Sequence, residues 1–428
     1  MKVLMFGWEF PPHISGGLGT ACQGIVKGLI HHDVKVIMVV PKAHGDEGEG
    51  KFRLLSAENV PVTSSGLYAK KLKEKLSFFE INSPVLPYIH PEDYERYLKS
   101  LSSQLNPAYQ KDPGAVSYRF SGKYGTGLMA EVWNYALVAG ELARTNDFDI
   151  IHAHDWLSFP AAILVKSISN KPLIVHMHST EFDRAGENVN QQIYRMERQA
   201  MESADQVIAV SGFTKQIIVD KYHIHPAKVV PIHNAVEQLQ ELPAKANRKF
   251  PREKIISYLG RVTFQKGPEY FIEAASKVLK KDNRFRFVMA GNGNLLNKMI
   301  EMTARLRISK RFHFPGFLKG SQVGRLLSMS DAYVMPSVSE PFGISPLEAM
   351  QRRIPSIISK QSGVQEILRN VIKVDFWNTD ALANAIYGIG AYHGISSTLA
   401  AGGMMEVQSL DWNDQSLKMK NLYQQFVT

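Results

Sequence analysis

The stretch DAYVMPSVSEPFGISPLEAM (residues 331–350) decides the fold, because it carries a strand, a turn and a helix in immediate succession. The apolar run AYVMPS (332–337) predicts a short buried strand, and PLEAMQRR (346–353) predicts the first turns of a helix. Two glutamates, Glu340 and Glu348, lie on either side of the Pro-Phe-Gly turn. We therefore expect one carboxylate at the carboxyl end of a strand and the other inside the helix that follows.

The second glutamate has a purely structural explanation. Ser345 at N-cap, Pro346 at N1 and Glu348 at N3 match a capping box, in which the carboxylate accepts a hydrogen bond from a backbone N–H. Taken alone, this motif leaves two interpretations open for Glu348, a helix cap and a ligand contact. The rest of the chain has to decide between them.

Apolar strands alternate with helical patterns along almost the whole chain, which is typical of parallel α/β layers. The first half has predicted strands at 2–7, 34–40, 148–154, 173–178, 206–211 and 228–233. The second half has them at 254–260, 285–291, 311–316, 332–337 and 354–359. The sequence therefore predicts an α/β fold of two doubly wound Rossmann-like domains facing a cleft. Ligands in such folds bind beyond the carboxyl ends of the strands.

A polar segment separates the two series of strands and is interpreted as a linker. The predicted order is an N-terminal domain (1–233) with an insertion at about 44–120, the linker (234–253), a C-terminal domain (254–407) and a terminal segment (408–428). In the terminal segment, Trp412, Met419, Tyr423 and Phe426 fall on one helical face. We expect that helix to pack across the two domains.

Composition narrows the class of protein. The 428 residues carry a net charge of +10, which favours anionic ligands, but the basic residues are spread out and form no nucleic-acid-binding signature. The single cysteine, Cys22, excludes an internal disulfide framework, and no apolar run approaches the roughly 20 residues of a membrane span. A cytoplasmic enzyme fits best. KKLKEKLSFF (70–79) could contact a membrane surface, although we favour a solvated helix face.

A glycine-rich loop, PHISGGLGT (12–20), follows the first predicted strand and opens a helix. Gly16, Gly17 and Gly19 allow the backbone to approach an anion at the helix N-terminus. A dinucleotide-binding fingerprint would need a third glycine where Cys22 stands, so a dehydrogenase is disfavoured.

A basic loop, GRVTFQKG (260–267), leaves the first strand of the second half. Arg261 and Lys266 could hold a diphosphate beside a helix start and stabilise it as a leaving group. An ordinary solvated loop can carry the same two residues, so this loop by itself does not decide.

Two strands each place a pair of histidines on one face, in IIHAHDW (150–156) and IVHMHS (174–179). No H-E-x-x-H motif accompanies them, so we expect no metal. The glutamate pair could suggest a glycosidase, whose two carboxylates flank the scissile bond. Glu340 and Glu348 belong to one loop–helix unit, however, and are poorly placed to act from two sides of a sugar.

Taken together, GGLG, HAHDW, GRVTFQKG and the E-x7-E of EPFGISPLE resemble the retaining glycosyltransferases of two Rossmann-like domains (GT-B). That group contains glycogen and starch synthases and sucrose synthase. The resemblance covers nearly the whole chain. It implies that Glu348 binds the nucleotide ribose, that Glu340 contacts hydroxyls of the donor sugar, and that Arg261 and Lys266 hold the diphosphate. It also implies that His154 approaches the anomeric centre.

The remaining implied contacts come from the backbone. The amides of Gly17 (beside Gly16), Ile344 and Ser345 would bind phosphate, and Phe342 and Gly343 would meet the sugar. No metal and no cofactor is implied, because the nucleotide-diphosphate sugar is a substrate. The expected donor is ADP- or UDP-glucose and the expected acceptor is an α-glucan chain. One departure concerns the donor, because Ile14 stands where ADP-glucose enzymes usually have the lysine of Lys-x-Gly-Gly-Leu.

Three other functions stay open at this stage. One is a glycosyltransferase that acts on a lipid or small molecule at a membrane surface. Another is a phosphorylase of similar architecture, although the second half offers no support for a pyridoxal lysine. The third is a catalytically silent nucleotide-binding module. Aromatic residues in the insertion favour the glucan, because aromatic faces stack on sugar rings; they are Phe52, Tyr68, Phe78, Phe79, Tyr88, Tyr109 and Tyr118.

Overall fold

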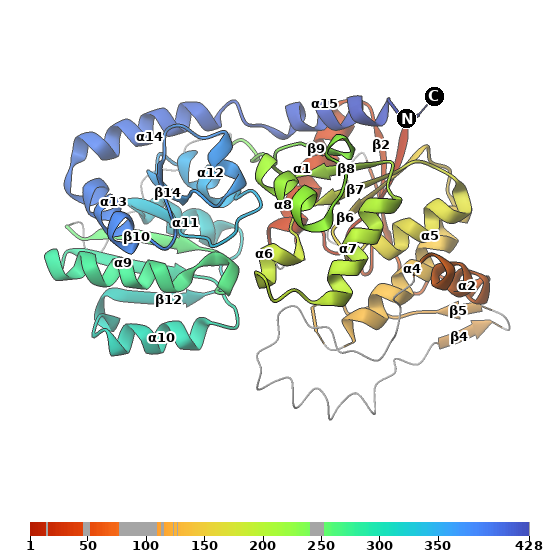
Figure 1. Ribbon diagram of the computed structural model, residues 1–428, viewed down its shortest axis with the longest axis horizontal. Helices are drawn as coiled ribbons and strands as arrows, with labels where there is room; N and C mark the ends of the chain where they lie inside the picture. The colour runs from red at the N-terminus through yellow and green to blue at the C-terminus, as the bar shows by residue number, and fades with distance from the viewer. Residues whose placement is uncertain are drawn as a thin grey trace. The chain divides into compact units, whose positions relative to one another are not determined.

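The computed structural model describes residues 1–13, 16–45, 52–76, 109–112, 115–122, 124–125, 127–239 and 252–427. They fall into two compact units, each built on one large parallel sheet with helices packed against it (Figure 1). Unit 1 comprises Met1–Phe182, Gly186–Asn234 and Trp412–Thr428, and unit 2 comprises Asp183–Ala185 and Ala235–Asp411. Two Rossmann-like α/β domains, as the sequence predicts, are thus present.

The sheet of unit 1 has seven strands in the order β3-β2-β1-β6-β7-β8-β9, and every neighbouring pair is parallel. The strands are β1 (Lys2–Phe6), β2 (Lys35–Val40), β3 (Arg53–Ser56), β6 (Ile150–His154), β7 (Leu173–Met177), β8 (Gln206–Ala209) and β9 (Val229–Pro231). A two-stranded hairpin, β4 (Tyr109–Asp112) with β5 (Ala115–Ser117), lies outside this sheet.

The helices of unit 1 cover both faces of its sheet. They are α1 (Gly17–His31), α2 (Ser65–Lys75), α4 (Leu128–Thr145), α5 (Phe159–Ser169), α7 (Gln191–Ser203), α8 (Gly212–Tyr222) and α15 (Trp412–Tyr423), while the short α6 (Glu181–Ala185) falls where the units divide. Because side chains alternate along a strand, Leu4 and Phe6 of β1 face the core beneath α4 and α5, and Val3 and Met5 are buried on the opposite face.

Unit 2 repeats the same strand order in a sheet of six parallel strands, β12-β11-β10-β13-β14-β15. They are β10 (Lys254–Leu259), β11 (Phe285–Ala290), β12 (Phe312–Gly316), β13 (Ala332–Met335), β14 (Ser356–Ser359) and β15 (Ile372–Val374). The helices are α9 (Pro268–Lys281), α10 (Leu296–Arg305), α11 (Ser321–Met329), α12 (Ser345–Met350), α13 (Thr379–Ala391) and α14 (His393–Val407).

The last helix, α15, packs against the first, α1, within unit 1 (Figure 1). Two glycines of α1 make room for it. A Cβ on Gly24 would lie 2.2 Å from the Trp412 ring, and one on Gly28 would lie 2.3 Å from Ser416 Oγ. The closeness of the two helices therefore depends on glycine at both positions.

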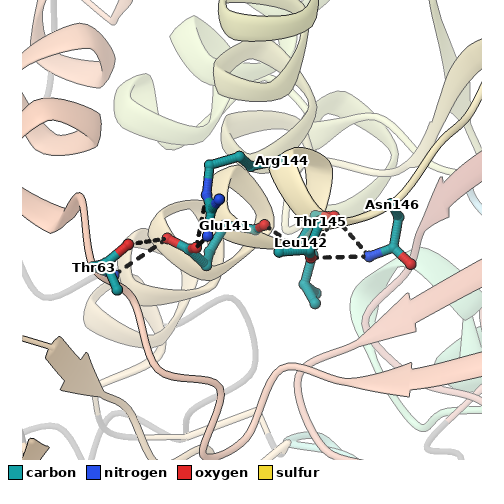
Figure 2. A network of polar contacts seen from close by, with 6 residues as sticks. All are labelled: Thr63, Glu141, Leu142, Arg144, Thr145 and Asn146. Carbon is teal, nitrogen blue, oxygen red and sulfur yellow. Dashed lines mark hydrogen bonds and ion pairs between the residues drawn. The ribbon is translucent and has the colours of Figure 1, made fainter.

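A buried carboxylate ties the described part of the insertion to α4 (Figure 2). Glu141 is 4% exposed and accepts from the Thr63 N–H and hydroxyl, both at 3.2 Å, and from Arg144 Nη2 at 2.5 Å. At the end of α4, Asn146 Nδ2 donates to the Leu142 carbonyl at 2.8 Å. Of the residues predicted to stack on sugars, Phe78, Phe79 and Tyr88 lie outside the described residues, and only the backbone of Tyr109 is described. Ile14, which bears on the choice of donor, also lies outside the described residues.

Within the described part of the chain, no helix combines the length and apolar character needed to cross a bilayer.

Candidate active site

The predicted site residues gather where the strand order of each sheet reverses. In unit 2 this point lies between β10 and β13, and in unit 1 between β1 and β6. Loops that leave neighbouring strands in opposite directions at such a point leave a crevice beyond the strand ends, where α/β proteins bind ligands. The predicted site residues therefore lie at the sheet edges where ligands bind in folds of this kind.

In unit 2 the structure brings Lys266 and Glu340 together. Glu340 is 6% exposed, and its carboxylate accepts a short charged hydrogen bond from Lys266 Nζ and a second bond from Ser337 Oγ at 3.1 Å. The two loops also join through backbone, since Val338 N–H donates to the Gln265 carbonyl at 2.9 Å. The ion pair thereby holds the Lys266 side chain in one position.

A glycine allows these two loops to approach so closely. Gly267 has a φ of 59° and follows the 3-10 turn Phe264–Lys266. A Cβ at this position would lie 2.2 Å from the Pro336 carbonyl oxygen, so only glycine fits.

The loop after β14 holds the backbone of the Pro-Phe-Gly turn. Glu340 N–H donates to Gln361 O at 2.9 Å, Gly363 N–H donates to Glu340 O at 2.9 Å, and Val364 N–H donates to Phe342 O at 2.8 Å. Gly343 then turns the chain with a φ of 106° and leads through Ile344 into α12. The sequence motifs did not point to residues 361–364, because their contribution is made by backbone atoms.

The capping-box interpretation of Glu348 is wrong. Helix α12 has Ile344 at N-cap and no side-chain cap, and the Ser345 hydroxyl lies 2.7 Å from the buried Tyr333 hydroxyl. Glu348 is partly buried, and burial raises the pKa of its carboxyl while Arg352 acts in the opposite direction. Because it caps no helix, this carboxylate is left for another use.

Arg261 lies in a loop that a second glycine-rich loop braces. Val262 N–H donates to Asn292 O at 2.9 Å, and Leu295 N–H donates back to Val262 O at 3.0 Å. Gly291, with a φ of 144°, passes so near that a Cβ would lie 1.8 Å from Gly260 O. The loop 291–294 therefore packs against the basic loop, and its signal in the sequence is the Gly-Asn-Gly that directly follows β11.

In unit 1, Gly16 and Gly17 begin α1 at the end of the loop that leaves β1. Gly16 is the N-cap, and a Cβ on either glycine would meet no atom within 4 Å. A residue not predicted for the site, Glu9, is 5% exposed and accepts from Gly19 N–H at 3.2 Å. A carboxylate thus occupies one amide of the helix N-terminus, where the macrodipole stabilises negative charge.

The His154 side chain is fully buried and contacts a second histidine that lies closer to the surface. Its Nδ1 lies 2.9 Å from Nε2 of His178, which is partly exposed just beyond the end of β7. Asp155, with a φ of 57°, accepts from the His178 backbone N–H at 2.7 Å. His178 therefore lies nearer the surface than His154, although the resemblance named only His154.

Burial keeps the inner histidines of this cluster neutral. It lowers the pKa of His152 to about 3, and it lowers the pKa of His154 and of His176 well below the usual range. Neighbouring imidazoles act in the same direction on all three, because a second positive ring close by would be repelled.

A polar hollow of about 520 Å³ opens beside the ends of β2 and β3 in unit 1. Its lining includes Lys42 and Glu58, whose charged atoms lie 3.6 Å apart, and the buried Glu131, which accepts from Ser121 N–H at 3.1 Å. Acids and cations are mixed there, which suits a ligand rich in hydroxyl groups.

Two family models match the chain. Residues 107–238 match "Glycosyltransferase Family 4", and residues 240–387 match "Glycosyl transferases group 1". The two matches are adjacent, and they divide close to Asn234, where the second stretch of unit 1 ends.

Among similar proteins, an uncharacterized glycosyltransferase of Methanocaldococcus jannaschii is 25% identical over 99% of this chain and 98% of its own. The glycogen synthase of Mycobacterium tuberculosis is 24% identical over 86% of this chain and 80% of its own.

Solved structures share the fold. Sucrose-phosphate synthase from Thermosynechococcus elongatus superposes with a TM-score of 0.73 at 19% identity, covering 99% of this chain and 98% of that one. Anabaena HepE in complex with UDP-glucose gives a TM-score of 0.64 at 16% identity, covering 99% of this chain and all (100%) of that one.

Proposed function

The chain belongs to the group 1 glycosyltransferases of GT-B fold, and we propose that it transfers glucose from a nucleotide-diphosphate sugar to an α-glucan with retention of configuration. The observation that carries the proposal is the ion pair of Lys266 with Glu340 at the point where the strand order of unit 2 reverses. It joins a cation suited to a phosphate with a carboxylate suited to sugar hydroxyls.

The basic loop would serve the leaving group. Negative charge grows on the diphosphate as its bond to the sugar breaks, and Arg261 and Lys266 would stabilise that charge. The amides of Ile344 and Ser345 at the start of α12, with the Gly16–Gly17 backbone of α1, would add donors of the same kind. Glu348, which caps no helix, would accept from the ribose hydroxyls.

The sugar would be held on its other side by carboxylate and backbone. Glu340 keeps lone pairs for a sugar hydroxyl while bonded to Lys266 and Ser337. Phe342 and Gly343 would approach through their backbones. The His154–His178 pair would face the anomeric centre, with His178 nearer the surface.

Retention follows without a protein nucleophile. The bond between C1 of the donor sugar and the phosphate oxygen breaks, and the acceptor hydroxyl oxygen forms its bond to C1 on the same face. The acceptor's proton passes to the departing phosphate oxygen. No metal and no cofactor is needed in this scheme, because the fixed cations stabilise the leaving group.

Three observations support a glucan as acceptor. The Gly-Gly-Leu loop is shared with glucan synthases, a glycogen synthase is among the similar proteins, and the polar hollow near Lys42 and Glu131 offers both donors and acceptors to hydroxyls. The HepE complex supports UDP-glucose as one donor to test beside ADP-glucose. We also propose that the enzyme works in the cytoplasm.

The deciding experiment supplies maltooligosaccharides with UDP-, ADP- or GDP-glucose and follows chain extension. We expect extension by one donor, an α linkage in the NMR spectrum of the product, and unchanged turnover after addition of EDTA. A β linkage, or activity that EDTA removes and Mg²⁺ or Mn²⁺ restores, would contradict the proposed mechanism.

A lipid-linked or small acceptor at a membrane surface is the second candidate, because α2 is strongly basic. It carries Lys70, Lys71, Lys73 and Lys75, and Leu67 beside them is 54% exposed. Sedimentation with glycogen and, separately, with vesicles of anionic lipid separates the two. Binding to vesicles alone, with no extension of maltooligosaccharides, would favour this second candidate.

A further inference from the structure

Three histidine rings meet inside unit 1 on the face of the sheet that α1 and α15 cover. His152 and His154 alternate with Ile151 and Ala153 along β6, and His176 of β7 pairs in register with His154. All three side chains are fully buried. One ring nitrogen from each lies within 4.8 Å of the others, so the cluster is compact.

Several nitrogens of these rings have no hydrogen-bond partner among the residues that the structure describes. They are Nε2 of His152, Nε2 of His154, and both Nδ1 and Nε2 of His176. A neutral imidazole has one donor and one acceptor, and a buried polar atom left without a partner is costly. Four such atoms in one cluster require an explanation that the surrounding side chains do not supply.

In two of these rings, those of His152 and His154, the Nδ1 atom lies within hydrogen-bond distance of another side chain. His152 Nδ1 lies 2.6 Å from the hydroxyl of Tyr423 on α15, and His154 Nδ1 lies 2.9 Å from His178 Nε2. Histidines that bind metals characteristically engage one ring nitrogen with such an outer partner, which orients the other nitrogen toward the ion. His152 and His154 both show this arrangement.

We propose that unit 1 binds a divalent transition-metal ion, of which Zn²⁺ is the best candidate, through His152 Nε2, His154 Nε2 and one nitrogen of His176. Imidazole is a preferred ligand of Zn²⁺, Co²⁺, Ni²⁺ and Cu²⁺, whereas Mg²⁺ and Ca²⁺ require oxygen ligands. Metal–nitrogen bonds of about 2.0–2.1 Å in tetrahedral geometry place ligand nitrogens about 3.4 Å apart. Small rotations of the rings from their separation of up to 4.8 Å achieve this.

The surroundings suit such an ion. The rings come from two adjacent strands, so an ion would tie β6 to β7. Through Tyr423 it would also fix α15 on the sheet. The proposed ion stabilises the unit and takes no part in leaving-group chemistry. It shares His154 with the proposed function, but it does not depend on which donor or acceptor the enzyme uses.

A second ligand set exists and has to be separated from the first. Cys22, His154 and His178 also bring one ligand atom each within 4.8 Å of one another. The set of three inner histidines is favoured because, among the described residues, His176 has two unpartnered nitrogens and His152 one, and an ion on the Cys22 set would leave them unpartnered.

The first test uses the full chain purified without a polyhistidine tag. Its metal content after dialysis is measured by mass spectrometry. The protein is then stripped with dipicolinate in mild denaturant, refolded, and titrated with Co²⁺ and with Zn²⁺. We expect about one ion per chain, visible d–d bands of tetrahedral Co²⁺, and a rise of the Tm with either ion. Refolded protein with no d–d bands and an unchanged Tm would overturn the proposal.

Variants then locate the ion. His176→Gln should abolish the metal-dependent rise of the Tm, whereas His313→Gln, at an exposed histidine of unit 2, should leave it intact. Tyr423→Phe should weaken Co²⁺ binding about 10- to 100-fold while the ligands remain. Cys22→Ser should change nothing. Loss of Co²⁺ binding in Cys22→Ser, or its full retention in both His176→Gln and His152→Gln, would assign the ion elsewhere and overturn the proposal.

Discussion

The two sheets share one strand order, yet the buried polar side chains near the point where that order reverses differ in their hydrogen bonding. In unit 2, Glu340 is bonded to Lys266 and Ser337, and the loop after β14 fixes its backbone. In unit 1, His176 has no partner on either ring nitrogen among the described residues. Glu340 therefore has hydrogen-bond partners without any ligand, whereas His176 has none among the described residues.

The difference comes from where the polar residues lie relative to their strands. Glu340 follows β13 in a loop, where neighbouring loops can supply charges and backbone donors. His152 and His176 lie within β6 and β7, where the backbone N–H and C=O groups already bond to adjacent strands. A polar side chain inside a parallel strand therefore depends on side chains from other elements, and here α15 supplies only Tyr423.

The largest expected effect concerns the complete arrangement of unit 2. Lys266→Ala should lower turnover about 10²-fold or more, because it removes a cation from the developing charge of the leaving group and leaves Glu340 unpaired. Arg261→Ala should act similarly. Steady-state kinetics measure both. Lys298→Ala, at an exposed ion pair with Glu269, is the matched control and should retain wild-type turnover. Wild-type rates in both site variants would refute the assignment.

In unit 1 the exposed and buried members of one histidine pair can be compared. His178→Ala should lower turnover about 10- to 100-fold, because it removes the ring that reaches the surface. His154→Ala should lower turnover and also the Tm, because its side chain is fully buried. Kinetics and thermal unfolding of both variants are measured together. Unchanged turnover in His178→Ala with loss in His154→Ala would restore the direct role to His154.

A smaller effect is expected at Glu348. Glu348→Gln should weaken donor binding about tenfold, because that is the typical contribution of a hydrogen bond to a charged group. Turnover at saturating donor should change little. Burial raises the pKa of this carboxyl in the folded protein, so its ionisation costs stability as pH rises through the raised value. The variant should therefore unfold at a higher Tm than wild type at about pH 8, and the difference should vanish near pH 4. A difference in Tm independent of pH would contradict this.

The smallest effect on activity is expected at Glu141, whose carboxylate accepts the hydrogen bonds drawn in Figure 2. Glu141→Gln should leave kinetics unchanged and destabilise unit 1, because the Thr63 N–H and hydroxyl lose their charged acceptor inside the fold. Thermal unfolding measures this as a fall of the Tm by a few degrees. The control is Glu202→Gln at the exposed pair with Arg198, where we expect no measurable change.

The sequence predicts most of the fold because its strands are buried on both faces and stand out as apolar runs. β6, β7 and β8 are buried at every residue. β3 and β15 were not predicted, because they are short edge strands of four and three residues with partly exposed side chains. Apolar periodicity is weak in strands of that kind.

In the site, sequence spacing identifies residues but not their partners. The spacing of Ser345 and Glu348 matches a cap, yet Tyr333, twelve positions upstream of the serine, lies against its hydroxyl. The Glu9 contact with Gly19 and the Gly291 contact with Gly260 depend on how loops fold back, which no local pattern encodes. The roles of Arg261, Lys266, Glu340 and Glu348 stay predictions for the variants above to test.

The packing of α15 on α1 has a consequence for how the chain is made. Unit 1 contains both the first residues and Trp412–Thr428, and unit 2 is encoded between them. On the ribosome, the face of α1 at Gly24 and Gly28 therefore stays uncovered while residues 235–411 are translated, and Trp412 and Tyr423 reach their places only after that. Unit 2 can complete its own sheet first. The N-terminal unit, although it is synthesised first, is the last to be finished.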